Sequence, residues 1–79
     1  MNIYWCYDPQ ELWGVYVIAK SRGRAKTFAS GQLDIKYIDV RTSIVRKDVK
    51  EKQECVVDLG SPLLKKYGLE YHDIEEDTK

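Results

Sequence analysis

The chain has 79 residues, of which 43% are hydrophobic and 33% are charged, and its formal net charge is zero. This composition is typical of a globular protein and argues against a disordered chain or a membrane span. A chain of this length is expected to form one domain with a small core. The amino terminus lacks the basic start and the long apolar run of a secretory signal, which predicts a cytoplasmic protein.

The amino-terminal part of the sequence predicts two strands joined by a turn. Residues 3–7 are rich in aromatic side chains, and Asp8-Pro9 is a pair that starts turns. Residues 13–19 are apolar, few in number and partly β-branched, which favours a second strand. We expect the two strands to pair as an antiparallel hairpin.

A short helix is predicted after the hairpin. Ser21 stands where a helix N-cap is expected, and Gly31 can adopt the left-handed conformation that ends a helix. Between these two residues, Ala25, Phe28 and Ala29 recur at helical spacing. The sequence therefore predicts a helix with a narrow apolar stripe that ends at Gly31.

A long strand, a loop and a returning strand follow. Apolar and polar residues alternate through residues 35–46, which predicts a strand. One face of this strand would carry Ile38, Val40, Thr42 and Ile44. Residues 48–54 are charged and nearly free of apolar groups, which suits an exposed hairpin loop. Residues 55–59 can then return as a strand.

The carboxyl-terminal part predicts a second short helix. Ser61-Pro62 combines an N-cap with proline at the first helical position, and Gly68 supplies a stop. Residues 69–74 predict a short edge strand, and residues 75–79 an acidic frayed tail. We therefore assign residues 1–74 to the single domain.

The order of predicted elements is strand, strand, helix, strand, strand, helix. This order predicts a small α+β fold with a mostly antiparallel sheet and one or two short helices packed on one face. Such a sheet leaves a second face and two edges that 79 residues can hardly cover. We therefore expect the chain to self-associate as a homodimer. From the composition, we expect that it does not enter a membrane.

The two cysteines are interpreted as reduced, buried thiols. Neither Cys6 nor Cys55 belongs to a Cys-x-x-Cys pair, and a cytoplasmic protein keeps its thiols reduced. A zinc site needs three or four ligands, and His72 together with the two cysteines has no spacing signature for one. We predict no metal ion and no cofactor.

No catalytic residue is predicted. His72 is followed by Asp73, but neighbours on a strand point to opposite faces and cannot act as a base and its orienting acid. The other carboxylates resemble ordinary solvated acids, and the five glycines are isolated. The chain is therefore predicted not to be an enzyme. The alternative is a small metal-binding or enzymatic subunit that uses His72 and the cysteines.

The sequence from Lys20 to Lys26 breaks the usual rules for a helix amino terminus. Cations there face the positive end of the helix dipole, and Lys20 with Arg24 and Arg22 with Lys26 place like charges four residues apart. Free backbone N–H groups and guanidinium groups together suit a phosphate or carboxylate. We therefore predict that Lys20, Arg22, Arg24 and Lys26 bind an anionic partner. The alternative is that they are solvated, or neutralised by the acidic residues 70–77.

Five large aromatic residues lie in the predicted hairpin: Tyr4, Trp5, Tyr7, Trp13 and Tyr16. In two paired strands such residues usually fill the core of a small domain, although they can also stack bases or form a protein-binding hot spot. Alternation places Trp5 and Tyr7 on the face opposite Tyr4. We take Trp5, Tyr7 and Trp13 as the candidates for contact with a partner.

Three motifs carry a resemblance to a known group of proteins: residues 13–19, Arg24-Ala25-Lys26 and Ile38-Asp39-Val40-Arg41. Over residues 13–46 the chain resembles small prophage and mobile-element proteins of Gram-positive bacteria. No activity or site residue is carried over from this group, but the resemblance favours a protein that binds a host or phage protein or nucleic acid. The sequence thus predicts a small binding protein that uses a basic helix N-terminus and an exposed sheet face.

Overall fold

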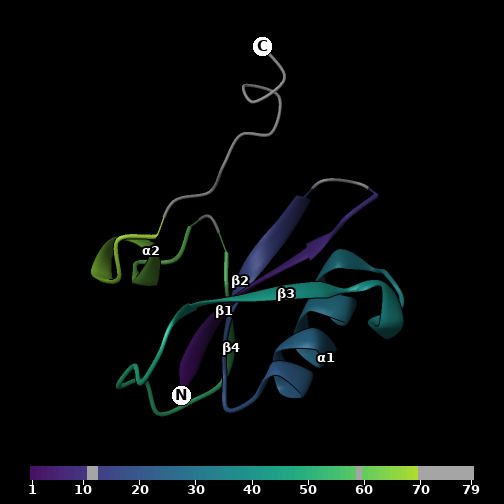
Figure 1. Cartoon of the computed structure of the whole chain (residues 1–79). Helices are drawn as coiled ribbons and strands as arrows, with labels where there is room; N and C mark the ends of the chain where they lie inside the picture. Colours follow the sequence, from purple (N-terminus) through teal and green to yellow (C-terminus); the bar gives the residue numbers. More distant parts are fainter. Residues whose placement is uncertain (11–12, 59, 70–79) are drawn as a thin grey trace.

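A computed structural model describes residues 1–10, 13–58 and 60–69, and its strands form one antiparallel sheet in the order β3-β1-β2-β4 (Figure 1). The strands are β1 (Asn2–Asp8), β2 (Trp13–Ala19), β3 (Arg41–Arg46) and β4 (Cys55–Val57). The helices are α1 (Arg22–Leu33), the 3-10 helix η1 (Tyr37–Asp39) and α2 (Leu63–Lys66). The predicted α+β fold with an antiparallel sheet is confirmed.

The central hairpin of β1 and β2 forms as predicted. The two strands pair along their whole length, from Asn2 opposite Ala19 to Asp8 opposite Trp13. Because side chains alternate along a strand, the hairpin divides its apolar residues between two faces. Tyr4 and Cys6 contribute to the core on one face, and Ile3 contributes to the core on the other.

Helix α1 covers the first of these faces. Ala25, Ala29 and Leu33 are buried and recur every four residues, so one narrow stripe of α1 meets the sheet. The Ser21 side chain accepts a hydrogen bond from the Arg24 N–H at 3.2 Å, which confirms the predicted N-cap. The small alanine side chains let the helix backbone approach the strands closely.

The predicted end of α1 at Gly31 is wrong. The helix continues to Leu33, and Asp34 adopts the left-handed conformation at φ 57° in place of a glycine. Its backbone N–H donates to the Ser30 carbonyl, and the Ser30 hydroxyl donates to the Ile35 carbonyl at 2.7 Å. Aspartate tolerates this conformation better than most residues, so a glycine is not required at the stop.

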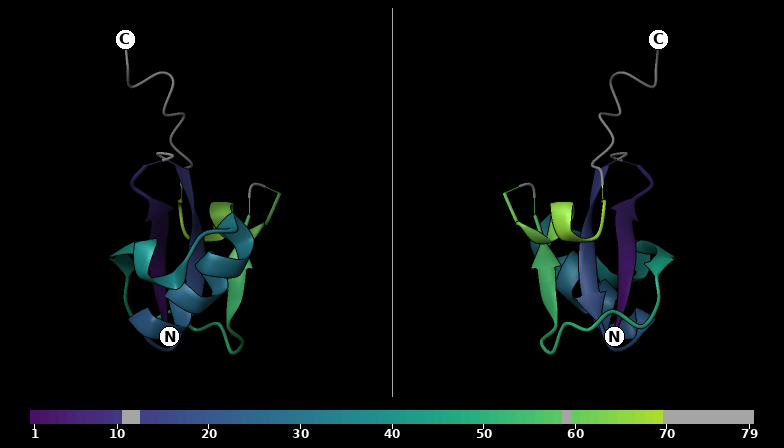
Figure 2. Two further views of the ribbon diagram at one scale, coloured as in Figure 1. Left: turned by 90° about the vertical axis from the view of Figure 1, so that its right-hand side faces the viewer. Right: turned by 90° about the vertical axis from the view of Figure 1, so that its left-hand side faces the viewer.

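Helix α2 lies on the opposite face of the sheet from α1 (Figure 2). The prediction that the helices share one face is therefore wrong for α2. Its Leu63 and Leu64 pack against a cluster that contains Ile3, Ile18 and Val57. The predicted stop is confirmed, because Gly68 has a φ of 64° and the Leu69 N–H donates to the Leu64 carbonyl at 2.8 Å. Both faces of the sheet thus carry a helix.

The prediction of one strand over residues 35–46 is wrong in its first half. Residues 37–39 form η1, in which the Asp39 N–H donates to the Lys36 carbonyl at 2.9 Å. Ile38 is 74% exposed, whereas Val40 is buried, so the two do not share an apolar face. Strand β3 begins only at Arg41, after this turn has led the chain from the end of α1 back to the sheet.

The prediction of a hairpin loop over residues 48–54 is also wrong. Strand β3 pairs with β1 and β4 pairs with β2, so the segment between them crosses from one edge of the sheet to the other. Val49 is buried on the way and exchanges two backbone hydrogen bonds with Met1, at 2.7 and 3.3 Å. This crossing segment carries charged side chains past the ends of both helices.

Helix length bears on the predicted absence of a membrane span. A span of the hydrocarbon core needs about 20 consecutive apolar residues. Helix α1 has 12 residues and α2 has four. Within residues 1–10, 13–58 and 60–69, no helix has the length and apolar character that crossing a bilayer requires.

Candidate functional site: the basic surface of α1 and β3

The four cations predicted to bind an anion lie around the start of α1. Lys20 precedes the helix, and Arg22, Arg24 and Lys26 lie in its first one and a half turns. Lys20, Arg22 and Arg24 are exposed, and Lys26 is half-buried. These four residues are close in sequence, but each makes a different set of contacts in the structure.

Arg24 forms an ion pair with Glu54 in the crossing segment. Its guanidinium contacts both carboxylate oxygens of Glu54, and Nε lies 2.9 Å from Oε1 and 3.2 Å from Oε2. The Lys20 backbone N–H also donates to Glu54 Oε2, at 2.9 Å. Hydrogen bonding by Arg24, with a further contribution from the Lys20 N–H, lowers the pKa of Glu54 to about 2. Arg24 is therefore neutralised inside the fold.

The predicted alternative partner for these cations, residues 70–77, lies outside the described residues. Within the described ranges, Glu54 takes the role of counter-charge, and nothing in the local sequence around it marks it for that role. It belongs to a run of charged residues that is typical of an exposed loop. Only the crossing of the sheet brings Glu54 beside the first turn of α1.

Arg22 connects α1 to the edge strand β3. Its Nη1 donates to the Thr42 carbonyl at 3.0 Å and to the Thr42 hydroxyl at 2.7 Å. The guanidinium carbon lies 5.8 Å from the centre of the Tyr4 ring. These contacts hold the Arg22 side chain along the sheet, while the positive charge has no ion-pair partner among the described residues.

Lys26 lies over the ring of Tyr37. The Lys26 ammonium is 4.8 Å from the ring centre, and Tyr37 is 43% exposed. The Tyr37 hydroxyl packs near the first turn of α1, where a Cβ on Gly23 would lie 3.4 Å from it. Tyr37 therefore forms part of the basic surface. The sequence does not indicate this, because the alternation of residues 35–46 predicts a strand at residue 37.

Strand β3 extends this basic surface along an edge of the sheet. It has a neighbouring strand on one side only, and Arg41 and Arg46 stand at its two ends. Between them Ile44 is 37% exposed and Val45 is 45% exposed. The pairing with β1 shifts register between Tyr4 and Ile3, which leaves Val45 without an opposite residue. We call Arg22, Lys26, Tyr37 and Thr42 the α1–β3 surface.

The aromatic candidates do not gather at this surface. Trp5 and Tyr7 are half-buried on the α2 side of the sheet, and the Trp5 ring contacts Tyr16 with centroids 4.8 Å apart. Trp13, the first residue of β2, is 52% exposed. Tyr4 and Tyr16 are buried, as expected for core residues. The three candidates therefore do not form one binding surface with the cations.

The two thiols lie on opposite faces of the sheet. Cys6 is fully buried beneath α1, and its thiol donates to the Ala25 carbonyl at 3.9 Å. Burial raises the pKa of Cys6 to about 12, although Arg22 lowers it slightly. Cys55 is only half-buried, which differs from the prediction, and burial, followed by the nearby Glu51, raises the pKa of its thiol.

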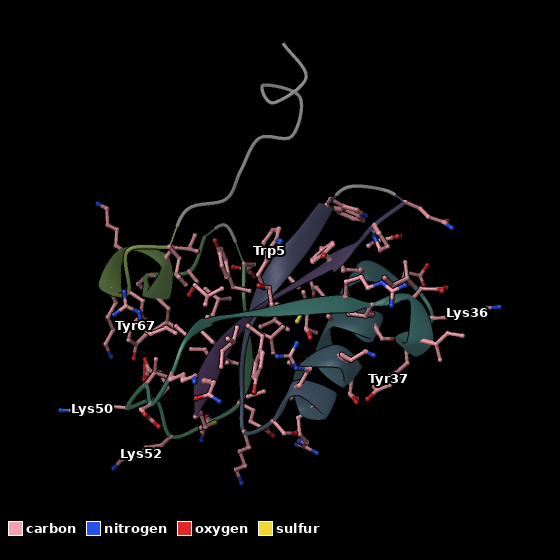
Figure 3. All side chains as sticks on the ribbon, in the orientation of Figure 1. Trp5, Lys36, Tyr37, Lys50, Lys52 and Tyr67 are labelled. Atoms are coloured by element: carbon pink, nitrogen blue, oxygen red, sulfur yellow. The ribbon has the colours of Figure 1, made fainter. Side chains whose placement is uncertain are left out.

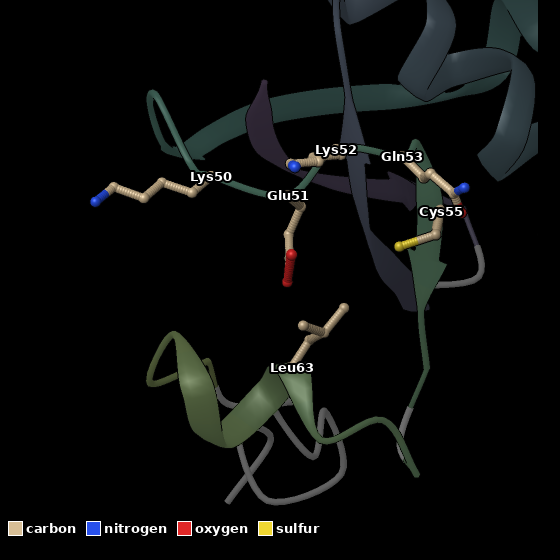
Figure 4. A pocket seen from close by; sticks show the side chains of 6 residues that line it. All are labelled: Lys50, Glu51, Lys52, Gln53, Cys55 and Leu63. Atoms are coloured by element: carbon tan, nitrogen blue, oxygen red, sulfur yellow. The ribbon is translucent and has the colours of Figure 1, made fainter.

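The position of Cys55 weakens the alternative of a site built from both cysteines. Its sulfur points into a cleft of about 480 Å³ that is lined by Glu51 and Leu63 among others (Figure 4). Cys6, under α1, cannot reach this cleft. His72 lies outside the described residues, and the described ones contain no cluster of three metal-ligating side chains.

Charge is distributed unevenly between the described residues and the rest. Residues 1–10, 13–58 and 60–69 contain twelve Lys and Arg but seven Asp and Glu, whereas the whole chain has 13 of each. The described part thus carries a net charge of +5. The whole chain is neutral, so this surplus is local in the sequence and is balanced by the charges of the remaining residues.

Comparisons with known protein families, with curated proteins and with solved structures found no match. The resemblance to prophage proteins therefore stays a prediction.

Proposed function

We propose that the protein is a small binding protein for single-stranded nucleic acid and that the α1–β3 surface holds the strand. The observation that supports this most directly is that Arg22 and Lys26 lie beside aromatic rings and have no ion-pair partner among residues 1–10, 13–58 and 60–69, while their neighbour Arg24 is paired with Glu54. Polyanion binding depends on cations that face phosphates and are not already paired.

The cations of this surface are oriented before any ligand arrives. Thr42 holds Arg22 through two hydrogen bonds, and the Tyr37 ring supports Lys26. Side chains that are already ordered lose less conformational entropy on binding, which favours affinity.

The exposed Tyr37 ring adds an apolar contact that suits unpaired bases. Bases of a single strand can stack on aromatic side chains, whereas the bases of a duplex are stacked on one another. Lys36 and Tyr37 lie together beyond one end of β3 (Figure 3). A strand running along this surface could therefore place phosphates on Arg22 and Lys26 and a base on Tyr37.

Binding to a short single-stranded oligonucleotide tests this proposal. The double variant Arg22→Gln/Lys26→Gln should bind at least about tenfold more weakly, and its log-log salt slope should flatten by up to about two units. Replacing Tyr37 with Leu should weaken binding by about 1–2 kcal/mol without changing the salt slope. Fluorescence anisotropy at several salt concentrations measures both effects.

Two controls make the result specific. The matched variant Lys52→Gln/Lys65→Gln removes the same charge from exposed lysines away from the α1–β3 surface, so its affinity should change little. Thermal unfolding of each variant shows whether the fold survives. Equal weakening by both double variants, or no binding by the unmodified protein at low salt, would overturn the proposal.

A second candidate function rests on the apolar part of β3. Ile44 and Val45 are exposed on an edge strand, and an extended segment of another protein could pair with that edge. Arg41 and Arg46 at the strand ends favour acidic residues in such a segment. If two copies of this chain instead paired their β3 strands antiparallel about the strand centre, Arg41 of each copy would lie opposite Arg46 of the other. These like charges would repel each other, which disfavours that pairing.

The substitution Val45→Glu separates this candidate from nucleic-acid binding and also tests the predicted homodimer. It places a charge in the exposed edge without touching Arg22, Lys26 or Tyr37. If β3 pairs with an acidic segment, the variant should lose binding of an acidic model peptide. Loss of self-association in sedimentation velocity would instead place the predicted homodimer at this edge. Unchanged behaviour in both measurements would contradict protein pairing at this edge.

A further inference from the structure

A second cationic site lies at the other end of β3, beyond the α1–β3 surface. A cavity of about 320 Å³ is formed between the start of the crossing segment and α2. It is lined by Arg46, Lys47, Asp48, Val49, Lys50, Lys66 and Tyr67. Figure 3 shows Lys50 and Tyr67 on the opposite side of the molecule from Lys36 and Tyr37. Four of the seven lining residues are cations, and one is an acid.

Two of these cations are held in place by α2. The Arg46 Nη2 donates to the Tyr67 carbonyl at 3.1 Å, and its guanidinium carbon lies 5.9 Å from the Tyr67 ring centre. The Lys66 ammonium lies 5.4 Å from the same ring and 3.1 Å from Glu51 Oε1. Tyr67 therefore brings together one cation from β3 and one from α2, which are distant in sequence.

The other two cations stand on a turn that is anchored to the sheet. Val49 is buried and hydrogen-bonded in both directions to Met1. Asp48 has a φ of 57°, and its N–H donates to the Asn2 side-chain oxygen at 3.1 Å. This anchored turn exposes Lys47 and Lys50 on either side of Val49. Neither lysine forms an ion pair with any residue in the described ranges.

The local charge is positive even after the nearby acids are counted. Asp48 lines the cavity and Glu51 pairs with Lys66, so four cations face two carboxylates. Bringing Arg46, Lys47, Lys50 and Lys66 together costs electrostatic energy unless an anion joins them. A doubly charged group with several acceptor oxygens would match both the charge and the N–H donors.

We propose that this cavity binds a phosphate group. Its source can be a small ligand with linked phosphates or a phosphate of a nucleic-acid backbone. The inference does not depend on nucleic-acid binding at the α1–β3 surface, because it uses none of the residues of that surface. In the bound state Arg46 and Lys66 contact the phosphate oxygens from their present positions, and Lys47 and Lys50 close over the exposed side.

Titration of the full chain with pyrophosphate at low ionic strength tests the site. Amide NMR shifts should change at residues 46–50 and at Lys66 and Tyr67, and should saturate with a single dissociation constant. The double variant Lys47→Gln/Lys50→Gln should weaken binding about tenfold, because it removes two of the four cations that line the cavity. The equally charged variant Lys52→Gln/Lys65→Gln should bind as the unmodified protein does.

Two further experiments test whether the site is independent of the α1–β3 surface and identify the source of the phosphate. Arg22→Gln/Lys26→Gln should leave pyrophosphate binding unchanged, so failure of the α1–β3 proposal would not imply failure here. Competition between pyrophosphate and a short single-stranded oligonucleotide identifies the source: displacement indicates a backbone phosphate, and its absence indicates a small ligand. Shifts spread over all basic residues, or equal weakening by the lysine control variant, would overturn the phosphate site.

Discussion

The two faces of the sheet are built by different means. The α1 face is closed by a continuous helix whose contact residues are small, chiefly Ala25 and Ala29, so the backbones lie close together. The α2 face is closed by one short helix and by larger side chains, among them Leu64 and Tyr67, which are only partly buried. The helix residues that close the first face are fully or almost fully buried, whereas those that close the second are only partly buried.

This difference bears on how the two candidate sites are positioned. On the α1 face the buried stripe fixes the helix, and its exposed first turn then presents Arg22 and Lys26 beside β3 in a defined orientation. On the α2 face, loose closure leaves clefts, and charged residues of the crossing segment line them. A buried helix stripe positions the first candidate site, and partly buried side chains of α2 border the second.

The largest expected effect comes from enlarging a side chain on the α1 face. Ala29→Leu adds a bulky group where α1 meets the sheet and should destabilise the protein by about 2–3 kcal/mol, because the helix must move away or the side chain must strain. Urea unfolding followed by circular dichroism measures the change. A loss below about 0.5 kcal/mol would show that the α1 face is not densely packed.

The matching change on the α2 face should cost less. Leu64→Ala removes a half-buried side chain from the α2 face and should destabilise by about 1–2 kcal/mol, less than for a fully buried leucine. The same unfolding measurement applies. If Leu64→Ala proves more damaging than Ala29→Leu, the contrast between the two faces is wrong.

The rates at which the two thiols react with a reagent test the same contrast between the faces. Cys55 should react with a soluble thiol reagent in the native protein, while Cys6 should react at least about a hundredfold more slowly, since it is buried and its pKa is raised to about 12. Mass spectrometry of labelled peptides gives the two rates. The variant Cys55→Ala should remain almost unlabelled until it is unfolded. Equal rates at the two cysteines would contradict the placement of Cys6 under α1.

A smaller effect is expected from the ion pair that ties α1 to the crossing segment. The pKa of Glu54 is about 2 in the folded protein, against about 4.3 for an unfolded chain. A lowered pKa means that this stabilisation is present above about pH 4.3 and is lost as the pH falls towards 2. Thermal midpoints of the unmodified protein and of Glu54→Gln should therefore converge between pH 4.3 and 2.

The control for this pH dependence is Asp39→Asn, which removes one acid from an exposed position away from Glu54. Its midpoints should stay parallel to those of the unmodified protein over the same pH range. Parallel curves for Glu54→Gln as well would contradict the pairing of Arg24 with Glu54.

Local patterns were sufficient for the parts of the fold that depend on neighbours in sequence. The aromatic and β-branched runs predicted the β1–β2 hairpin, Ser21 marked the start of α1, and Gly68 marked the stop after α2. These patterns were misleading where more than one residue could end a helix. Asp34 replaced Gly31 as the helix stop, because aspartate also tolerates the left-handed conformation.

The candidate site was predictable in its composition but not in its contacts. Lys20 to Lys26 stand out in the sequence because they oppose the helix dipole. Which of these cations are paired depends on Glu54 and Thr42, at least 20 residues away in the sequence. No local signal links such distant positions, so the sequence does not distinguish Arg24, which is paired with Glu54, from Arg22, which has no ion-pair partner within the described ranges.

The sequence by itself determined the hairpin, the two helices, the antiparallel class of the sheet and the surplus of cations between residues 20 and 50. These properties follow from side-chain periodicity, caps and charge, which act over a few residues. Only the tertiary structure decided that β3 and β4 occupy opposite edges, that α1 and α2 cover opposite faces, and that Arg46 meets Lys66 around Tyr67. Strand order and helix placement depend on burying both faces of the sheet at once, and that requirement joins residues from the whole chain.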